Sequence, residues 1–277
     1  MSLKTIVACL TLPESAPSVV ASALRVAERQ QARLVGLHVI PRVPLYNLAG
    51  MDTPAEYIER EEQALKARAE EIEKIFLQAA KASSVATDWR CVQSPTSDPV
   101  KAILGNARWG DLVVMSQYLG VFDEIEMSSE VVLGTGRPVL IVPKVGDWQE
   151  IGSRIVIAWN GKREAARAAF DALPFLAQAD SVRILTINPD EIDDDEGLTS
   201  GADLAVSMTY HGVKAVTVTS HPSDISVGSD LLSRIADESC DLLVMGCYGH
   251  SRLREFVFGG VTREIMQHMT VPVLMSR

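Results

Sequence analysis

DLLVMG, residues 241–246, is a short apolar run that opens on an acidic residue and closes on a glycine. DLVVMS, residues 111–116, repeats this run with serine in place of the glycine, and three further runs recur in the same order in both halves of the chain. The pairs are KTIVACL (4–10) with RIVIAWN (154–160), LVGLHVIP (34–41) with VRILTINP (182–189), and RPVLIVP (137–143) with VPVLMSR (271–277). Because a chance match would not keep the order, we infer that one structural unit is present twice.

The repeated runs are rich in Val, Ile and Leu and lack polar alternation, which is typical of parallel strands covered by helices on both faces. Longer segments of helical period separate them, so each copy predicts βαβ units and an open, doubly wound sheet of five strands. The fold class is therefore α/β, with two tandem domains at residues 1–146 and 152–277. In the second copy we expect strands near 154–159, 182–187, 213–219, 241–245 and 272–275, and helices near 162–178, 198–211, 227–239 and 260–268.

Composition narrows the possible environments and partners. The 277 residues include four cysteines without a CxxC pair, which favours a reducing compartment. The sequence shows neither the long apolar segment of a secretory signal nor the roughly 18 apolar residues of a membrane span. A net charge of −10 opposes broad binding to nucleic acid but permits a small phosphorylated ligand held by backbone amides. We expect a cytoplasmic protein that engages neither membrane nor nucleic acid.

The most unusual segment is GCYGHSRLREFVFGGVT, residues 246–262, which contains four glycines between two apolar runs. It starts where a strand is expected to end, and Gly259 and Gly260 precede an expected helix. Unpaired backbone N–H groups at the start of a helix bind phosphate readily, and glycine lets a ligand approach them closely. The pattern favours a phosphate site, although chain turning alone would also explain the glycines. A P-loop is absent from the sequence, and LGTGRPV (133–139) lacks the third glycine of a dinucleotide fingerprint.

Gly246-x-x-Gly249, nine further residues and then Gly259 resemble the G-2x-G-9x-G-(S/T) signature of universal stress proteins in their ATP-binding branch. The repeated unit resembles the tandem form of that family, whose fold is also described as adenine nucleotide alpha hydrolase-like. The resemblance implies a stress-response protein that binds ATP, or AMP or ADP, in its C-terminal repeat and acts as a signalling or regulatory module. It implies nucleotide contacts from Ala158, Asn160, Ile187, Met245, Gly246, Gly249, His250, Gly259, Gly260, Val261 and Thr262.

Two of these residues depart from the family pattern. Gly260 stands where the family has Ser or Thr, so we expect the hydroxyl of Thr262 to replace the missing contact to phosphate. Asn160 stands where Asp is usual; its amide can accept from a ribose hydroxyl but brings no charge for a metal, which leaves a role for Mg²⁺ open. Asn160 would equally suit an ordinary turn between a strand and a helix.

The first copy has lost the motif. By the alignment of the repeats, Leu10 takes the place of the acidic residue, and Ser116, Leu119 and Glu126 take the places of the three glycines. We therefore expect residues 1–146 to be a degenerate repeat that keeps the fold and contributes an interface. The two repeats are expected to pair as an intramolecular pseudo-dimer, and a further homodimer remains open.

Two alternative functions remain at this stage. A slow ATPase would use the same loop, but the sequence lacks a P-loop lysine and an evident general base, so we assign no catalytic residue and consider an enzyme less favoured. A nucleotide-free structural or interaction protein would leave the loop empty. Cys247 and His250 could ligate a metal only if two further ligands converged, and we assign no metal site.

Overall fold

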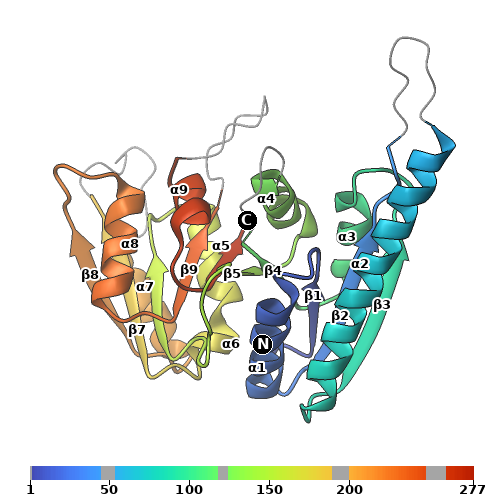
Figure 1. Cartoon of the computed structure of the whole chain (residues 1–277). Helices are drawn as coiled ribbons and strands as arrows, with labels where there is room; N and C mark the ends of the chain where they lie inside the picture. The colour runs from blue at the N-terminus through green and yellow to red at the C-terminus, as the bar shows by residue number, and fades with distance from the viewer. Residues whose placement is uncertain (1, 45–53, 118–123, 189–199, 248–259) are drawn as a thin grey trace. The chain divides into compact units, whose positions relative to one another are not determined.

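The computed structural model describes residues 2–44, 54–117, 124–188, 200–247 and 260–277 (Figure 1). The contacts divide the chain into two compact units. One comprises Leu3–Ser116, and the other comprises Gln117–Arg277 together with Met1–Ser2. We call them the N-terminal unit and the C-terminal unit.

The N-terminal unit is a parallel sheet with the strand order β3-β2-β1-β4. Phe76 and Trp89 pack beside each other in its core, with ring centroids 5.3 Å apart. Its strands are β1 (Thr5–Cys9), β2 (Arg33–Ile40), β3 (Thr87–Gln93) and β4 (Leu112–Ser116), and its helices are α1 (Ala16–Gln30), α2 (Ala55–Lys81) and α3 (Val100–Ala107).

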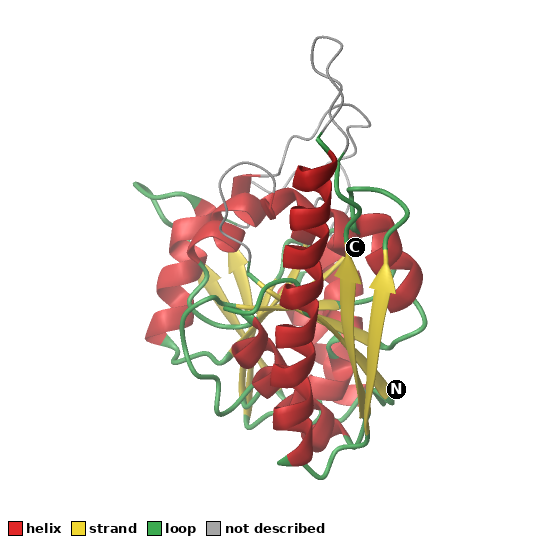
Figure 2. Ribbon diagram, turned by 45° about the vertical axis from the view of Figure 1, so that its right-hand side comes forward, coloured by secondary structure: helices red, strands yellow, loops and turns green. Residues whose placement is uncertain are grey.

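The C-terminal unit contains a sheet with the order β5-β10-β9-β6-β7-β8. Helices lie on either side of the strands, as expected for right-handed crossovers (Figure 2). The strands are β5 (Val139–Val142), β6 (Arg154–Ala158), β7 (Ser181–Ile187), β8 (Ala215–Ser220), β9 (Leu242–Gly246) and β10 (Val273–Ser276). The helices are α4 (Glu124–Thr135), α5 (Arg163–Asp171), α6 (Leu173–Leu176), α7 (Gly201–Tyr210), α8 (Val227–Asp237) and α9 (Gly260–His268).

The elements expected in the second copy are confirmed, with one difference. The helix expected over 162–178 is interrupted at Ala172, which ends α5 and precedes α6. Pro174 lies in the first turn of α6, where its missing N–H does no harm, whereas it would break a hydrogen bond inside one continuous helix.

Strand β5 joins the C-terminal unit although its residues belong to the first sequence repeat. It pairs antiparallel with β10, with Ile141 opposite Val273 and Leu140 opposite Leu274. The other strand pairs described in this unit are parallel. The compact units therefore divide at residue 116, whereas the domain bounds expected from the sequence follow the repeat.

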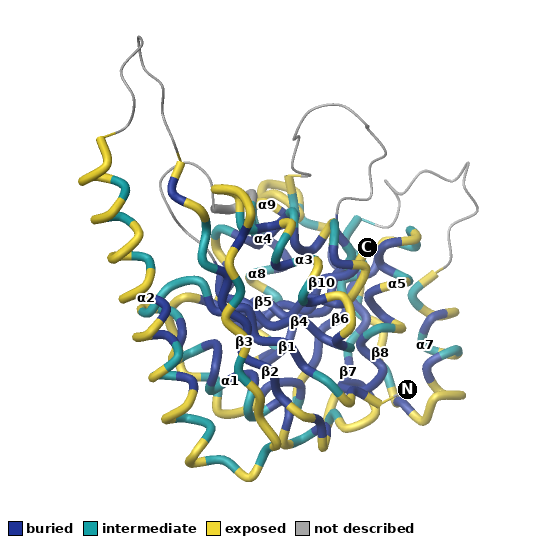
Figure 3. Tube along the Cα trace, turned by 90° about the vertical axis from the view of Figure 1, so that its right-hand side faces the viewer, coloured by how far each residue is buried: buried dark blue, intermediate teal, exposed yellow. Residues whose placement is uncertain are grey.

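Burial explains why the strand sequences are so uniformly apolar. Every residue of β4, β5 and β10 is buried, as the dark blue of the central strands indicates (Figure 3). The edge strand β3 exposes most of its residues, and β8 exposes half of its own. Among the described residues, every helix is too short or too polar to span a bilayer.

Candidate functional site

The strand order of the C-terminal unit places its switch point between β6 and β9. From β6 the chain proceeds to β7 and β8 on one side and then returns to β9 and β10 on the other. Ligands of doubly wound proteins bind at the carboxyl ends of the strands at such a point. Ala158 and Met245 are opposite each other near these ends, so the structure brings two of the expected site residues together. Gly246 follows directly as the last residue of β9.

Asn160 forms the turn that leads from β6 into α5. Its side-chain oxygen Oδ1 accepts a hydrogen bond from the N–H of Lys162 at 3.1 Å, which is the geometry of an Asx turn. Gly161 has φ of +72°, a left-handed conformation that glycine adopts without strain. Asn160 is exposed. This turn explains the presence of Asn160 even if no ligand binds. Because its side chain is exposed, a ligand could still reach it.

Gly246 is required by the packing of helix α5. A Cβ atom at this position would overlap the backbone of Glu164 and Ala165 in the first turn of the helix. Glycine at the end of β9 therefore lets the start of α5 lie against the strand end. This packing role is independent of any nucleotide, so the first glycine of the motif has a structural reason of its own.

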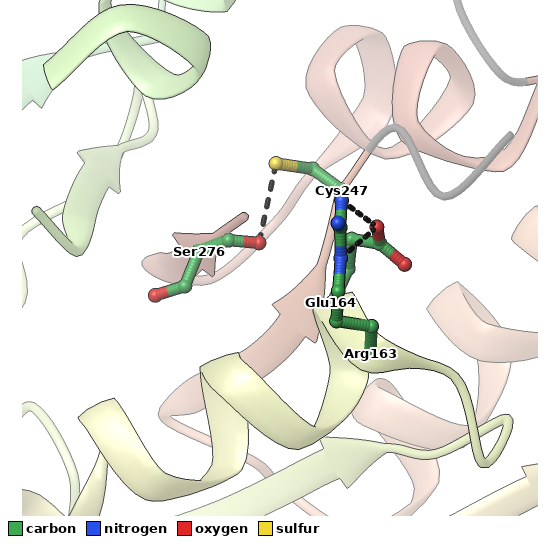
Figure 4. Close-up of polar contacts among 4 residues, drawn as sticks. All are labelled: Arg163, Glu164, Cys247 and Ser276. Atoms are coloured by element: carbon green, nitrogen blue, oxygen red, sulfur yellow. Dashed lines mark hydrogen bonds and ion pairs between the residues drawn. The ribbon is translucent and has the colours of Figure 1, made fainter. Parts of the chain in front are cut away.

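Glu164, in the first turn of α5 and near Cys247, was missed by the sequence analysis (Figure 4). Its side chain is only 8% exposed, and its Oε1 accepts from Nη2 of Arg163 at 2.8 Å and from Nε at 3.1 Å. An acidic residue in the first turn of a helix is favourable because the helix dipole is positive there. That preference was the available signal, but it does not reveal burial beside Gly246.

Cys247 is a neutral buried thiol at the end of β9. Burial raises its pKa to about 12, with Arg277 lowering it and the negative charge of Glu164 raising it. The Sγ atom donates to the carbonyl oxygen of Ser276 at 3.4 Å, and the backbone N–H of Cys247 donates to the same oxygen at 3.1 Å (Figure 4). Among the described residues, no group of three His, Cys, Asp or Glu side chains is arranged to hold a metal ion.

Helix α9 carries three further expected site residues. Gly260 is exposed, and a Cβ at this position would meet no atom of the described residues within 4 Å. Val261 is half-buried, and Thr262 is buried with 5% exposure. The remaining residues of the motif, Gly249, His250 and Gly259, lie outside the described residues.

Ile187 ends strand β7, next to β6 at the same carboxyl edge. It is half-buried. The following residue, Asn188, has φ of +46° and donates its backbone N–H to the carbonyl of Ser220 at 2.8 Å. The strand end is therefore fixed by β8.

Strand pairing within each unit corrects the alignment of the two copies by one residue. The N–H of Leu10 donates to Leu37 O, and the N–H of Trp159 donates to Leu185 O. Leu37 and Leu185 are equivalent by the repeat of 34–41 with 182–189, so Leu10 corresponds to Trp159. The expectation that Leu10 takes the place of Asn160 is therefore wrong.

Thr11 is the first-copy residue that corresponds to Asn160, since each follows the residue just aligned. Ser116 does correspond to Gly246, because Leu112 pairs with Ile6 just as Leu242 pairs with Ile155. Leu119 lies outside the described residues, as does the side chain of Glu126. The first copy thus places hydroxyl side chains at two of the matched positions.

Together these features define a doubly wound α/β protein of two tandem units, with a glycine at the switch point of the second. The family model described as the universal stress protein family matches residues 2–115 and 153–277. The chain therefore belongs to the universal stress protein family.

Individual relatives are more distant. The universal stress protein Slr1230 of Synechocystis sp. is 44% identical over 41 residues, which is 15% of this chain and only 14% of that protein. A universal stress protein from Archaeoglobus fulgidus DSM 4304 has a TM-score of 0.71 at 16% identity, covering 98% of each chain. A functionally unknown protein from Pseudomonas aeruginosa PAO1 has a TM-score of 0.62 at 9% identity, covering 99% of this chain and 92% of that one. At such identities the two structures show a shared fold.

Proposed function

We propose that the C-terminal unit binds an adenine nucleotide at the switch point between β6 and β9, and that the protein acts as a signalling or regulatory module in a stress response. The observation that carries the proposal is the meeting of Ala158, Met245 and Gly246 at one carboxyl edge, in a member of this family whose glycine motif starts at Gly246. Doubly wound sheets hold their ligands at this place.

Each group has a distinct part in this proposal. The exposed side chain of Asn160 would hydrogen-bond a ribose hydroxyl, and Ile187 at the end of β7 would contact the base. The N–H groups at the start of α9, from Gly260 onward, would receive phosphate oxygens at the positive end of the helix dipole. The part of the chain that the structure describes leaves room beside Gly260, which supports this role.

The buried carboxylate of Glu164 bears on the choice between AMP, ADP and ATP. Its negative charge raises the pKa of Cys247, the residue after Gly246, so this charge, although paired with Arg163, opposes each additional phosphate charge placed nearby. We therefore propose that AMP binds without a metal and that ATP binds best with Mg²⁺, which would offset part of the added charge. Asn160 lacks the charge to hold Mg²⁺, so the ion would be held mainly by the nucleotide.

The proposal also covers assembly and location. The antiparallel pairing of β5 with β10 supports an intramolecular pseudo-dimer of the two repeats, since a strand of the first repeat completes the sheet of the second. Further homodimerisation would add to this arrangement. A cytoplasmic location rests on the cysteine pattern of the sequence.

Nucleotide binding is tested by thermal unfolding and isothermal titration with AMP, ADP and ATP, with and without Mg²⁺. A ligand at 100 times its Kd should stabilise the protein by about 2.7 kcal/mol. Asn160→Ala should weaken binding, whereas Thr11→Ala, at the matched position of the first copy, should not. If no nucleotide shifts the Tm of the wild-type protein, a nucleotide-free interaction protein is the better description. Phosphate release from bound ATP would instead favour a slow ATPase.

A further inference from the structure

Gln117 is a buried residue of the C-terminal unit whose backbone and side chain are both fixed by hydrogen bonds. It is 6% exposed, and its backbone N–H donates to Val142 O at 2.6 Å. Its Nε2 donates to Met266 O at 2.8 Å and to Gln267 O at 3.3 Å. Its Oε1 accepts from the N–H of Lys144 at 3.1 Å. The amide therefore uses its acceptor on the chain after β5 and its donors on helix α9.

The contact with α9 completes the end of that helix. The last four carbonyl groups of an α-helix have no partner within the helix. Helix α9 ends at His268, so Met266 and Gln267 belong to its last turn. A side-chain NH₂ group held between these two carbonyls supplies the missing donors and fixes where the helix ends.

A second anchor holds the side of α9 against α8. The hydroxyl of Ser226 donates to Oε1 and Oε2 of Glu264 at 2.6 and 2.7 Å, and the hydroxyl of Ser229 donates to Oε1 at 2.5 Å. Ser226 is also the N-cap of α8, since its side chain accepts from the N–H of Ser229. The carboxylate thus lies at the positive end of a second helix.

We infer that Gln117 is a positioning residue for the proposed nucleotide site. It fixes the C-terminal end of α9, and through the rigid helix it fixes the N–H groups at Gly260 that would bind phosphate. Residues 260 and 266 are separated by roughly 9 Å along a helix, so Gln117 acts through α9 rather than on the ligand. Small displacements of preorganised donors weaken binding markedly. This inference rests on the proposed function.

A Gln117 variant should affect the binding of the phosphate and of the nucleoside differently. Gln117 controls α9, whereas the groups expected to contact ribose and base, Asn160 and Ile187, follow β6 and end β7. Loss of the Gln117 side-chain hydrogen bonds should therefore weaken the binding of AMP more than the binding of adenosine. A general loss of stability would lower both affinities equally or leave both unchanged.

The experiment compares AMP and adenosine by isothermal titration on the full chain. Gln117→Met keeps the length of the side chain and removes its hydrogen bonds. We expect AMP affinity to fall about fivefold, the equivalent of one hydrogen bond of about 1 kcal/mol, with adenosine affinity unchanged. Val213→Ala is the control, because Val213 is 2% exposed and lies between α7 and β8, where its N–H donates to Met208 O, so its truncation lowers stability but leaves the hydrogen bonds of Gln117 in place. This control should leave the ratio of the two affinities unchanged.

A second variant and a second measurement guard against a folding failure. Gln117→Glu keeps an acceptor for Lys144 and replaces the donors by a charge that repels the carbonyls, so it should show the same selective loss of AMP. Amide hydrogen exchange over residues 261–266 should accelerate in both variants. An unchanged ratio of AMP to adenosine affinity, in variants of a wild-type protein that binds both, overturns the role of Gln117 alone. A wild-type protein that binds neither ligand overturns the proposed function and this inference together.

Discussion

Gln117 and Cys247 occupy matched positions in the two copies, one residue after the fourth strand, and their backbones behave alike. Each N–H donates to the matched carbonyl of the fifth strand, Val142 O at 2.6 Å in the first copy and Ser276 O at 3.1 Å in the second. Their side chains differ. The Cys247 thiol stays with Ser276, whereas the Gln117 amide reaches α9. Backbone pairing thus persists in both copies while the side chain is free to take a new partner.

The residue before each of these, Gly246 in the second copy and Ser116 in the first, also differs between the copies. Gly246 leaves no space for a Cβ because the first turn of α5 lies against it, but Ser116 is accommodated and buried at the same place in the first copy. The connections differ: β1 ends at Cys9 and α1 begins at Ala16, whereas β6 ends at Ala158 and α5 begins at Arg163. The shorter turn of the second copy brings the helix closer, and glycine is the residue that fits.

The largest expected effect is that of Gly246→Ala. The new methyl group would overlap backbone atoms of Glu164 and Ala165, which cannot move aside as a side chain can. We expect the free energy of unfolding to fall by about 2 to 3 kcal/mol, measured by urea denaturation. Gly260→Ala, where the methyl group would meet none of the described atoms within 4 Å, is the control and should be neutral or slightly stabilising. Equal stability of both variants would contradict the packing role of Gly246.

Asp241→Ala should cause the second-largest loss of stability. The Oδ1 atom of buried Asp241 accepts from the N–H of Gly152 at 2.8 Å and of Arg154 at 3.0 Å, so truncation leaves the buried N–H of Gly152 without this partner. A loss of about 1 to 3 kcal/mol is expected in urea denaturation. Asp111, its match in the first copy, makes the equivalent bonds from a half-buried side chain. Asp111→Ala should therefore lower the free energy of unfolding by less than Asp241→Ala. The reverse order would show that burial of the carboxylate does not determine the size of the loss.

Asn160→Ala tests the corrected register. Loss of the bond to Lys162 should lower stability by about 1 kcal/mol or less. Asn160→Thr introduces the residue found at the matched position of the first copy. If Thr11 marks a lost site, Asn160→Thr should keep the fold and lose nucleotide affinity, as titration calorimetry would show. Full affinity in this variant would mean that the first copy remains competent at this position.

The smallest expected effect is on the pH dependence of stability. Hydrogen bonds from Ser226 and Ser229 lower the pKa of Glu264 below its usual 4.5. The carboxylate therefore contributes stability above that pH, and the contribution disappears as the pH falls through the lowered pKa. Burial raises the pKa of Asp241 above 3.8, so its contribution has the opposite sign and decreases as the pH rises. Melting curves over the acid range should show a weaker acid-induced loss for Glu264→Gln and a steeper one for Asp241→Asn.

Much of this fold could be predicted from the sequence because the strands are buried runs in a repeated order. The break before Pro174 was missed, because the helix was expected to run through 162–178, although proline inside a helix removes a hydrogen bond and marks such a break. The register that aligns β1 with β6 could not be predicted. KTIVACL and RIVIAWN are apolar nearly throughout, so a shift by one residue exchanges one buried side chain for another and leaves no trace in the pattern.

The candidate site was only partly predictable for a different reason. Ala158, Met245 and Gly246 follow from the strand ends, which local sequence marks. Glu164 and Gln117 acquire their roles from contacts with distant segments; Gln117 and Met266 are 149 residues apart in the chain. Neither residue belongs to a motif, so only the folded arrangement reveals what it touches.

The placement of β5 beside β10 limits how the chain can be divided. A fragment that begins at residue 152 would follow the sequence repeat, yet it would lack both β5 and Gln117. The amide and carbonyl groups that β10 turns toward β5 would then be open to solvent, and such an edge recruits other chains. The second repeat in isolation would be prone to self-association, whereas a fragment that begins at residue 117 would retain its own edge protection.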